Sequence, residues 1–250
     1  MNEESLNIDD FGIGNAKISE IKKLEPALYL VPTPIGNIDD ITIRAVKVLS
    51  SANIIACEDT RNSIKLLKML NIHYEKLISY HEYNERDRAV ELIRAIENGK
   101  SVAIISDAGS PGISDPGFRV INEAIKSNIK IIPLPGANAI LPAILGSGFA
   151  LNEFVFLGFP PQKKGRKTFL LNASQITKTL IIYESTHRIG KLIKEIIEYF
   201  GSETEICIAR EISKKFEEFI RGTAIEIYDI YEQRKEFKGE IVVVINKRED

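Results

Sequence analysis

The chain of 250 residues lacks the features that mark several large classes of protein. Its only cysteines, Cys57 and Cys207, lie in separate apolar runs and are too few for a disulfide framework or a zinc site. No apolar run approaches the ~18 residues of a membrane span. Lysine and arginine total 33 against 35 aspartates and glutamates, so the net charge of -2 does not by itself indicate a nucleic-acid-binding protein. These absences predict a protein of the reducing cytoplasm without a membrane segment.

The motifs of several common enzyme classes are also missing. There is no G-x-x-x-x-G-K-S/T loop for nucleoside triphosphates and no G-x-S-x-G turn of the serine hydrolases. Gly12-Ile13-Gly14 does not begin a dinucleotide-binding G-x-G-x-x-G, because Lys17 stands where the third glycine belongs. The three histidines, His73, His81 and His187, do not have the spacing of metal ligands. We therefore predict no resident metal ion.

Residues 1–25 differ in composition from the rest of the chain. They are polar and acidic and lack the apolar segment of a signal peptide, so we expect a polar N-terminal extension. Hydrophobic residues make up 44% of the chain and charged residues 27%, the usual proportions for a globular protein with a substantial core.

From residue 26 onwards, short apolar runs alternate with amphipathic segments. The apolar runs are continuous, which is typical of strands that are buried on both faces in a mostly parallel sheet. Asp39 and Asp40 are placed to cap one helix, and Asp115-Pro116 is placed to begin another, with proline at its first position. The predicted strands of this first block are 28–31, 53–57, 76–79, 101–105 and 129–132, and its other predicted helices lie around residues 64–70 and 85–97.

A composition shift follows the first block, since glycines and prolines punctuate residues 146–165. We therefore predict two α/β domains, residues 26–136 and 137–250, with the boundary between 136 and 160. The second domain has predicted strands near 179–183, 205–209, 216–222 and 239–245, and predicted helices near 187–200 and 223–233.

The loops that follow the first five strands are rich in glycine, proline and charged residues. In open α/β sheets ligands bind at the carboxyl ends of the strands, where glycines let a ligand approach the backbone and carboxylates or a guanidinium supply chemistry. The same residue types also build ordinary turns. The residues themselves therefore indicate a ligand cleft without fixing its chemistry. The five loops are Pro32–Asn37, Glu58–Arg61, Tyr80–Glu82, Asp107–Gly112 and Pro135–Asn138.

These loops, in this order, resemble those of the ribosomal RNA small subunit methyltransferase I family, which belongs to the S-adenosylmethionine-dependent enzymes of the tetrapyrrole methylase type. The resemblance runs from about residue 28 to residue 246. The extension over residues 1–25 is longer than the family pattern. The matching stretches are 28–40, 56–61, 79–82, 106–117 and 133–137, followed by 156–161, 183–188, 209–211, 221–223 and 238–240.

The resemblance implies two α/β domains of the tetrapyrrole methylase type, with the S-adenosylmethionine site in the cleft between them. It implies 2′-O-methylation of a cytidine ribose in 16S rRNA, near the decoding site of the small ribosomal subunit, by a cytoplasmic homodimer. By correspondence with the family motifs, the residues expected to hold the methyl donor are Ile35, Asp107, Ala108, Ser110, Asn138, Ala139 and Tyr183.

Methyl transfer from a sulfonium is an in-line displacement that depends mainly on alignment, and it needs no metal in principle. A ribose hydroxyl is a weak nucleophile, so a positioned base would help. The sequence leaves that base unassigned, because Asp59 and Glu184 could equally form structural ion pairs with Arg61 and Arg188. The catalytic candidates are Glu58, Asp59, Arg61, His81 and Glu184, with Glu82 and His187 as further candidates.

RNA contacts are expected from local basic segments. Residues 163–167 hold four basic side chains in five positions, and such a segment can follow phosphates or simply begin a solvated helix. The predicted RNA-binding residues are Lys163, Lys164, Arg166, Lys167 and Arg188, and weaker candidates are Arg210, Lys214, Lys215 and Arg221.

Two alternatives stay open at this point. One is an enzyme of the same fold that methylates a tetrapyrrole or a protein, and the other is a ribosome-binding factor without catalytic activity. The loop Thr33–Asn37 and the stretch Tyr183–Arg188 favour the RNA enzyme over the first alternative. The intact loops at the strand ends argue against the second, which an absence of donor binding would favour.

Overall fold

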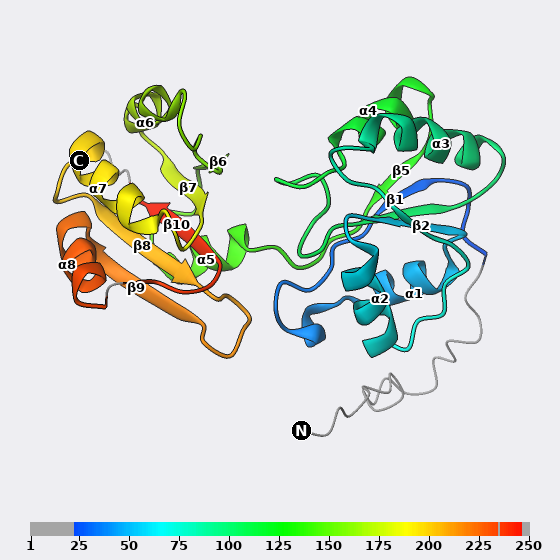
Figure 1. Cartoon of the computed structure of the whole chain (residues 1–250), viewed down its shortest axis with the longest axis horizontal. Coiled ribbons are helices and arrows are strands. Elements are labelled where there is room, and N and C mark those ends of the chain that lie inside the picture. Colours follow the sequence, from blue (N-terminus) through cyan, green and yellow to red (C-terminus); the bar gives the residue numbers. More distant parts are fainter. Residues whose placement is uncertain (1–22, 235, 247–250) are drawn as a thin grey trace. The chain divides into compact units, whose positions relative to one another are not determined.

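The computed structural model describes residues 23–234 and 236–246 (Figure 1). Within these ranges the chain separates into two compact units, and the division falls between Asn138 and Ala139. The predicted extension over residues 1–25 lies outside the described residues except for its last three positions. No helix within the described ranges is long and apolar enough to cross a membrane.

The first unit is built on a parallel sheet. Among the described residues this sheet has five strands in the order β3-β2-β4-β1-β5, and each neighbouring pair is parallel. The strands at its centre are almost fully buried, which explains their continuous apolar sequences and confirms the prediction of a mostly parallel sheet. The strands are β1 (Leu28–Leu30), β2 (Ile54–Cys57), β3 (Leu77–Ser79), β4 (Val102–Ile105) and β5 (Ile131–Pro133).

Helices cover both faces of this sheet (Figure 1). Alternate strand residues point to opposite faces, so Ile55 joins the core under α1 and α2, whereas Ile54 joins the core under α3 and α4. Leu49 and Leu67 fill the first of these cores, and Leu92 lies in the second. The helices are α1 (Ile43–Ser51), α2 (Thr60–Met69), α3 (Glu85–Glu97) and α4 (Phe118–Lys126), and Ile38–Asp40 forms a short 3-10 turn, η3.

The start of α1 differs from the prediction. Asp39 and Asp40 do not cap it, because they lie inside η3, which is capped by Asn37. Thr42 caps α1 instead, and its hydroxyl oxygen accepts a hydrogen bond of 3.0 Å from the backbone nitrogen of Ala45. Because η3 occupies Ile38–Asp40, α1 begins only at Ile43.

The start of α4 also differs, since Asp115-Pro116 precedes the helix rather than beginning it. The cap is Gly117, at φ 154°, and a Cβ there would lie only 2.9 Å from the backbone nitrogen of Gly112. Ser114 has a φ of 63°. Residues with such backbone angles cannot continue a right-handed helix. Asp115, which lies between Ser114 and Gly117, is therefore part of the loop after β4 and not of α4.

The second unit contains a mixed sheet in the order β6-β7-β10-β8-β9, in which β6 is parallel to β7 and the other pairs are antiparallel. Its core packs α7 against the sheet, with Leu192 and Ile196 against Ile208 and Val243. The strands are β6 (Phe154–Gly158), β7 (Thr179–Glu184), β8 (Glu205–Arg210), β9 (Glu218–Thr223) and β10 (Ile241–Ile245), and the helices are α5 (Ile140–Ser147), α6 (Arg166–Ser174), α7 (Ile189–Phe200) and α8 (Ala224–Arg234).

The elements α5, β6 and α6 were not predicted from the sequence. Of these, β6 lies within the region 146–165 where glycine and proline indicated punctuation, and α5 and α6 border it; Gly165 begins α6 from a left-handed conformation at φ 85°. Tertiary packing overrides the weak local signal there: Leu170 of α6 is fully buried in the core of the unit.

One edge of the second sheet collects three loops. Ile241 at the start of β10 lies opposite both Glu184 and Arg210, the last residues of β7 and β8. Since β6 is parallel to β7, its carboxyl end lies at the same edge. The loops over residues 159–165, 185–188 and 211–217 therefore leave the sheet at the same edge, with β10 between the second and the third.

Candidate functional site

The loops after β1 and β4 are joined into one structure at the carboxyl edge of the first sheet. Thr33 and Gly109 exchange two backbone hydrogen bonds of 2.9 Å each. The buried Thr33 hydroxyl also donates to the backbone oxygen of Ser106 at 3.1 Å. The loop containing Ile35 is thereby fixed beside the loop containing Asp107.

The loop after β5 packs onto the same structure. Gly136 approaches Pro32 so closely that a Cβ would lie 2.7 Å from the proline ring, so only glycine fits there. The Ser110 hydroxyl donates to the backbone oxygen of Ala137 at 3.5 Å. Three loops of the parallel sheet therefore form a single rigid platform.

The residues predicted to hold the methyl donor divide between the two units. The platform carries those of the first unit, which are Ile35, Asp107, Ala108, Ser110 and Asn138. In the second unit Ala139 is the cap residue of α5, and Tyr183 lies in β7 with its ring 4.8 Å from that of Phe156 and 5.4 Å from that of Phe159.

Asp107 connects the platform to the loop after β2. Its Oδ1 accepts a hydrogen bond of 3.2 Å from the backbone nitrogen of Asp59, and its Oδ2 accepts one of 2.8 Å from the Asn62 amide. Asp107 is nevertheless exposed, so the outer side of its carboxylate is open to a ligand. These bonds fix the orientation of a carboxylate at the centre of the sheet edge.

Asp59 and Arg61 form the structural ion pair that the sequence left open. The Arg61 guanidinium contacts the Asp59 carboxylate at 2.6 Å, and the Asp59 carboxylate also accepts the Arg61 backbone N–H at 2.8 Å. These bonds lower the pKa of Asp59 to about 2, which makes it a weak proton acceptor. Asp59 is the cap residue of α2 in this arrangement.

Two other carboxyl groups at this edge have raised pKa values. Burial, followed by the charges of Glu58 and Asp107, raises the pKa of Asp115 to about 7. Burial and the nearby Asp107 charge likewise raise the pKa of Glu58. A group that exchanges its proton near neutral pH is suited to acid–base catalysis. The sequence interpretation missed Asp115 because its position before proline resembled a helix start.

Glu58 and Asp115 border a cavity of about 670 Å³ in the first unit. A cavity of this size can accept a nucleotide-sized ligand. The ring of Phe118, which is 75% exposed, stands at its wall. The lining residues are Glu58, Glu82, Glu85, Ser114, Asp115, Pro116, Phe118, Arg119, Asn122, Glu123 and Lys126.

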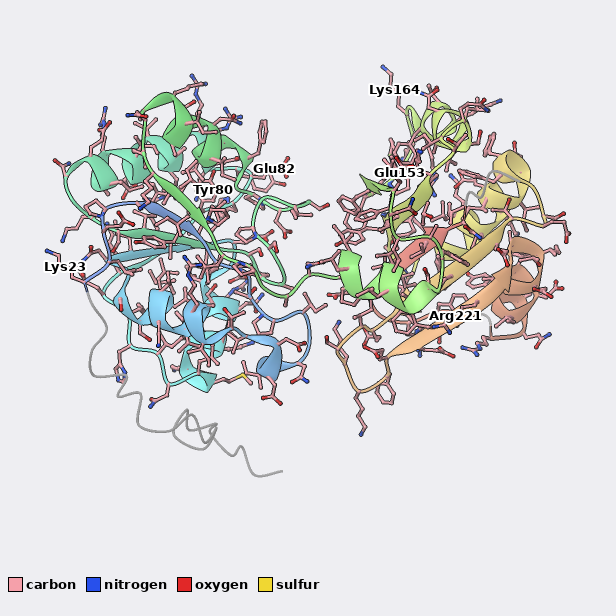
Figure 2. All side chains as sticks on the ribbon, turned by 180° about the vertical axis from the view of Figure 1, so that it is seen from behind. Lys23, Tyr80, Glu82, Glu153, Lys164 and Arg221 are labelled. Atoms are coloured by element: carbon pink, nitrogen blue, oxygen red, sulfur yellow. The ribbon has the colours of Figure 1, made fainter. Side chains whose placement is uncertain are left out.

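The end of β3 supplies a wall of this cavity. Tyr80 is buried, and its hydroxyl donates to Glu85 at 3.2 Å and accepts the backbone N–H of Val120 at 3.3 Å, which ties α3 to α4. Glu82 is exposed at the sheet edge (Figure 2). The Nε2 of His81 lies 3.2 Å from the Asn84 amide, and its buried Nδ1 has no hydrogen-bond partner within the part of the chain that the structure describes.

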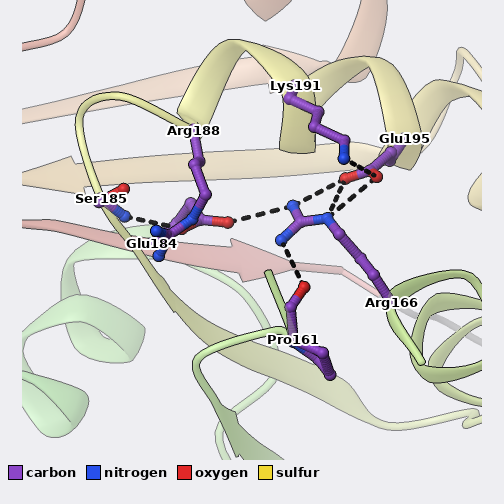
Figure 3. Close-up of polar contacts among 7 residues, drawn as sticks. All are labelled: Pro161, Arg166, Glu184, Ser185, Arg188, Lys191 and Glu195. Carbon is purple, nitrogen blue, oxygen red and sulfur yellow. Dashed lines mark hydrogen bonds and ion pairs between the residues drawn. The ribbon is translucent and has the colours of Figure 1, made fainter. Parts of the chain in front are cut away.

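Arg166 is not exposed as an RNA contact would need to be, which corrects that prediction. Its side chain is 4% exposed and makes ion pairs with Glu184 at 3.1 Å and with Glu195 at 2.7 Å (Figure 3). The other guanidinium nitrogen donates to the backbone oxygen of Pro161 at 3.3 Å. The bonds leave Arg166 no open face for a phosphate.

Glu184 belongs to the same network rather than to an open catalytic site. Its side chain is fully buried, and its second oxygen accepts hydrogen bonds of 2.8 Å from the Ser185 backbone nitrogen and from Arg188 Nε (Figure 3). Arg188 remains 28% exposed. The three lysines of the basic segment, by contrast, are exposed, and Figure 2 shows Lys164 extending away from the fold.

No group of three or more histidine, cysteine, aspartate or glutamate side chains that could hold a metal ion occurs in residues 23–234 and 236–246. Cys57 and Cys207 are both buried, and burial raises the pKa of each thiol to about 11, which makes a reactive thiolate at neutral pH rare.

Comparison with known proteins gives a consistent result. Residues 27–228 match the family of Tetrapyrrole (Corrin/Porphyrin) Methylases. The chain is 44% identical over 229 residues to the ribosomal RNA small subunit methyltransferase I of Mesorhizobium japonicum, which covers 91% of this chain and 78% of that protein. It is 44% identical over 220 residues to the protein of the same name from a Hydrogenobaculum species, covering 88% of this chain and 95% of that one.

Solved structures share the fold at low sequence identity. A diphthine synthase superposes with a TM-score of 0.67 and 13% identity, over 88% of this chain and 90% of that one. A cobalt precorrin-4 methyltransferase gives a TM-score of 0.63 at 15% identity, over 88% and 95% of the two chains. A uroporphyrin-III C-methyltransferase from Thermus thermophilus, complexed with S-adenyl homocysteine, gives 0.58 at 15% identity, over 88% and 97%.

The buried network around Arg166 generates a prediction about stability. Arg166→Met leaves the carboxylates of Glu184 and Glu195 without their shared cation, so it should lower the free energy of unfolding by about 3–5 kcal/mol. Lys167→Met, on the exposed face of the same helix, should change it by less than about 0.5 kcal/mol. Urea unfolding followed by circular dichroism measures both. Equal midpoints for the two variants would show that the network has no stabilising role.

Proposed function

Because the chain belongs to the ribosomal RNA small subunit methyltransferase I family, within the tetrapyrrole methylases, we propose that it methylates 16S rRNA in the small ribosomal subunit. The acceptor is the 2′-hydroxyl of a cytidine ribose near the decoding site, and the donor is S-adenosylmethionine. The observation that carries the proposal is 44% identity over 91% of the chain to a relative of that name. The family match over residues 27–228 includes every loop of the carboxyl edge.

The platform fits the chemistry of this donor. The donor has a cationic sulfonium, an amino-acid tail and an adenosine, and it supplies the electrophilic methyl group. Backbone groups at Ala108 and Asn138 and the exposed Asp107 carboxylate can bind its polar parts, while Ile35 offers apolar contact. From the second unit, Ala139 and Tyr183 complete the proposed set. No metal is needed for this chemistry.

The cavity beside the platform is the proposed place of the acceptor nucleotide. There the 2′-oxygen bonds to the donor methyl group as the sulfonium–methyl bond breaks, S-adenosylhomocysteine leaves, and the hydroxyl proton passes to a base. Asp115 is the group best placed to take it, because it borders the cavity and exchanges its proton near neutral pH. Burial first, and then the charges of Glu58 and Asp107, raise the pKa of Asp115 into this range.

The remaining catalytic candidates take other roles in this proposal. Asp59 and Arg61 fix the loop after β2, and Glu184 fixes Arg166 and Arg188. The ring of His81 is held by the Asn84 amide, 3.2 Å from its Nε2. Lys163, Lys164 and Lys167 are the proposed phosphate contacts, and the active form is proposed to be a homodimer.

The type of methylation is tested by alkaline digestion. The protein is incubated with radiolabelled S-adenosylmethionine and small subunits from cells that lack the activity, and the rRNA is then digested with alkali. Cleavage by alkali requires a free 2′-hydroxyl, so the expected product is a labelled dinucleotide that resists digestion. Label in mononucleotides would indicate base methylation and contradict the 2′-O assignment. Donor binding without labelled RNA would favour a tetrapyrrole or protein substrate, and absence of donor binding would favour the non-catalytic factor.

The role of Asp115 predicts a pH dependence. The carboxylate is the reactive form, and with a pKa of about 7 it is lost as the pH falls through neutrality. Hence kcat/KM of the wild type should fall about tenfold per pH unit below ~7, and Asp115→Asn should lower kcat by about 100-fold or more and remove this limb of the profile. Glu82→Gln, at another wall of the same cavity, is the control and should keep it. An unchanged profile in Asp115→Asn would exclude Asp115 as the base.

The exposed lysines predict a separate effect on RNA affinity. The combined variant Lys163→Glu, Lys164→Glu and Lys167→Glu should raise KM for small subunits and reduce the slope of log affinity against log salt by about 2, because fewer counterions are released on binding. The Kd for the methyl donor should stay unchanged. Reversal of Lys47, Lys65 and Lys68 in the first unit, which are also exposed, is the control for overall charge. Equal effects of the two triple variants would contradict a specific role for this segment.

A further inference from the structure

The loop between β8 and β9, residues 211–217, projects beyond the ends of both strands in Figure 1. At its tip the ring of Phe216 is 65% exposed, one of the largest exposures of an aromatic side chain in the second unit. The ammonium of Lys215 lies over that ring, 5.7 Å from its centroid. The tip thus presents an aromatic face and a positive charge together.

The backbone of this loop is fixed by several polar contacts. Arg210 donates to the backbone oxygen of Phe216 at 3.2 Å, and its Nε donates to the backbone oxygen of Lys238 at 3.0 Å. Arg210 also makes an ion pair of 3.1 Å with Glu218. The guanidinium of Arg210 is therefore engaged in holding the tip rather than available for RNA.

A second set of contacts fixes the other side of the loop. One oxygen of Glu211 accepts hydrogen bonds of 3.0 Å from Lys214 Nζ and from the Glu240 backbone nitrogen. The Ser213 backbone nitrogen donates to Glu217 at 2.7 Å. Glu211 and Ser213 adopt left-handed φ values of 52° and 65°, which persist only where the surroundings determine them. Lys214, like Arg210, is thus a structural residue.

These contacts do not serve to pack a buried side chain, because Phe216, at the tip of the loop that they fix, is exposed. An exposed aromatic side chain on a rigid backbone loses little conformational entropy when it binds, which is the property of a preorganised binding anchor. Two nearby carboxylates are neutralised, because Glu211 pairs with Lys214 and Glu218 of β9 pairs with Arg210, while Glu217 accepts the backbone N–H of Ser213. Lys215 has no ion-pair partner among the described residues and remains exposed.

The sheet order places the tip at one edge of the second sheet, with β7 and β10 between β8 and β6. Arg210 and Glu184 lie opposite the same residue of β10, so the tip leaves the sheet at the edge that also carries the loop with Lys163 and Lys164. Aromatic rings combined with basic side chains are the common means of binding single-stranded nucleic acid, in which the ring stacks on a base and the cation contacts a phosphate.

We propose that the β8–β9 tip is an RNA-docking element that stacks Phe216 on an unpaired base of the substrate, with Lys215 contacting the adjacent phosphate. The tip acts in binding and takes no part in the methyl-transfer step. This inference rests on the proposed function in taking RNA as the partner, and it adds a contact outside the residues assigned there.

The test compares Phe216→Ala with Phe216→Tyr in the full chain. Loss of one stacked base should weaken binding to small subunits about 10-fold in Phe216→Ala, whereas Phe216→Tyr keeps the ring and should bind as the wild type does. Binding is measured by co-sedimentation with small subunits, alongside KM and kcat for methyl transfer, and kcat at saturation should be unchanged. Lys215→Gln should reduce the salt slope by about 1.

Tyr74→Ala is the matched control, because Tyr74 is an exposed aromatic residue in the first unit. It precedes β3 and so lies away from the carboxyl edge of the first sheet. It should leave binding unchanged. The inference is overturned if Phe216→Ala binds within twofold of the wild type, or if Phe216→Tyr is as weak as Phe216→Ala. It is also overturned if Phe216→Ala changes the oligomeric state in analytical ultracentrifugation, since the tip would then contact a second copy of the chain.

The failure of the proposed function is seen separately. If Phe216→Ala binds small subunits more weakly than the wild type, but the wild type transfers no methyl group to them, the proposed activity is contradicted and the docking element is supported. If the wild-type protein and Phe216→Ala methylate small subunits equally well, the proposed activity is supported and the docking element is overturned.

Discussion

Two backbone hydrogen bonds between Thr33 and Gly109 hold together the edge on which the first unit's site depends. All strands of this sheet are parallel, so their carboxyl ends emerge at one edge, but strand geometry alone would leave the loops there independent. The bridge joins the loop after β1 to the loop after β4, and Gly136 packs the loop after β5 against Pro32. A methyl transfer, which depends on alignment more than on strong chemical groups, needs such a fixed platform.

The same edge places negative charges where their mutual effect is useful. Asp107 is oriented by Asp59 and Asn62, and its charge, with that of Glu58, acts on the partly buried Asp115. Glu58, Asp59 and Asp115 have different environments, so the pKa of Asp59 is lowered whereas the pKa values of Glu58 and Asp115 are raised. Asp59, neutralised by Arg61, serves as a structural group, whereas Asp115 borders the cavity and has a pKa raised to about 7 by burial and by the charges of Glu58 and Asp107.

In the second unit, burial separates basic residues that are adjacent in sequence. Arg166 turns inward to Glu184 and Glu195, while its neighbour Lys167 stays exposed. Arg210 and Lys214 likewise face carboxylates and backbone oxygens, which leaves Lys215 and Phe216 at the surface. The fold itself is shared with enzymes at 13% to 15% identity, so substrate preference must arise from such side chains rather than from the sheets.

Continuous apolar runs such as Ile54–Cys57 were enough to predict the parallel sheet of the first unit, since such strands are stable only when both faces are covered. It also indicated the loops of the site and, through their resemblance to a family, the reaction. It could not place Asp115, whose loop geometry depends on Gly112 and Gly117 packing together. Nor could it tell Arg166 from the lysines beside it, because burial is decided by residues distant in sequence, such as Glu184 and Glu195. Periodicity and loop composition are local properties that can be seen in the sequence alone. The shifted pKa of a carboxyl group and the burial of an arginine arise only when the chain has folded.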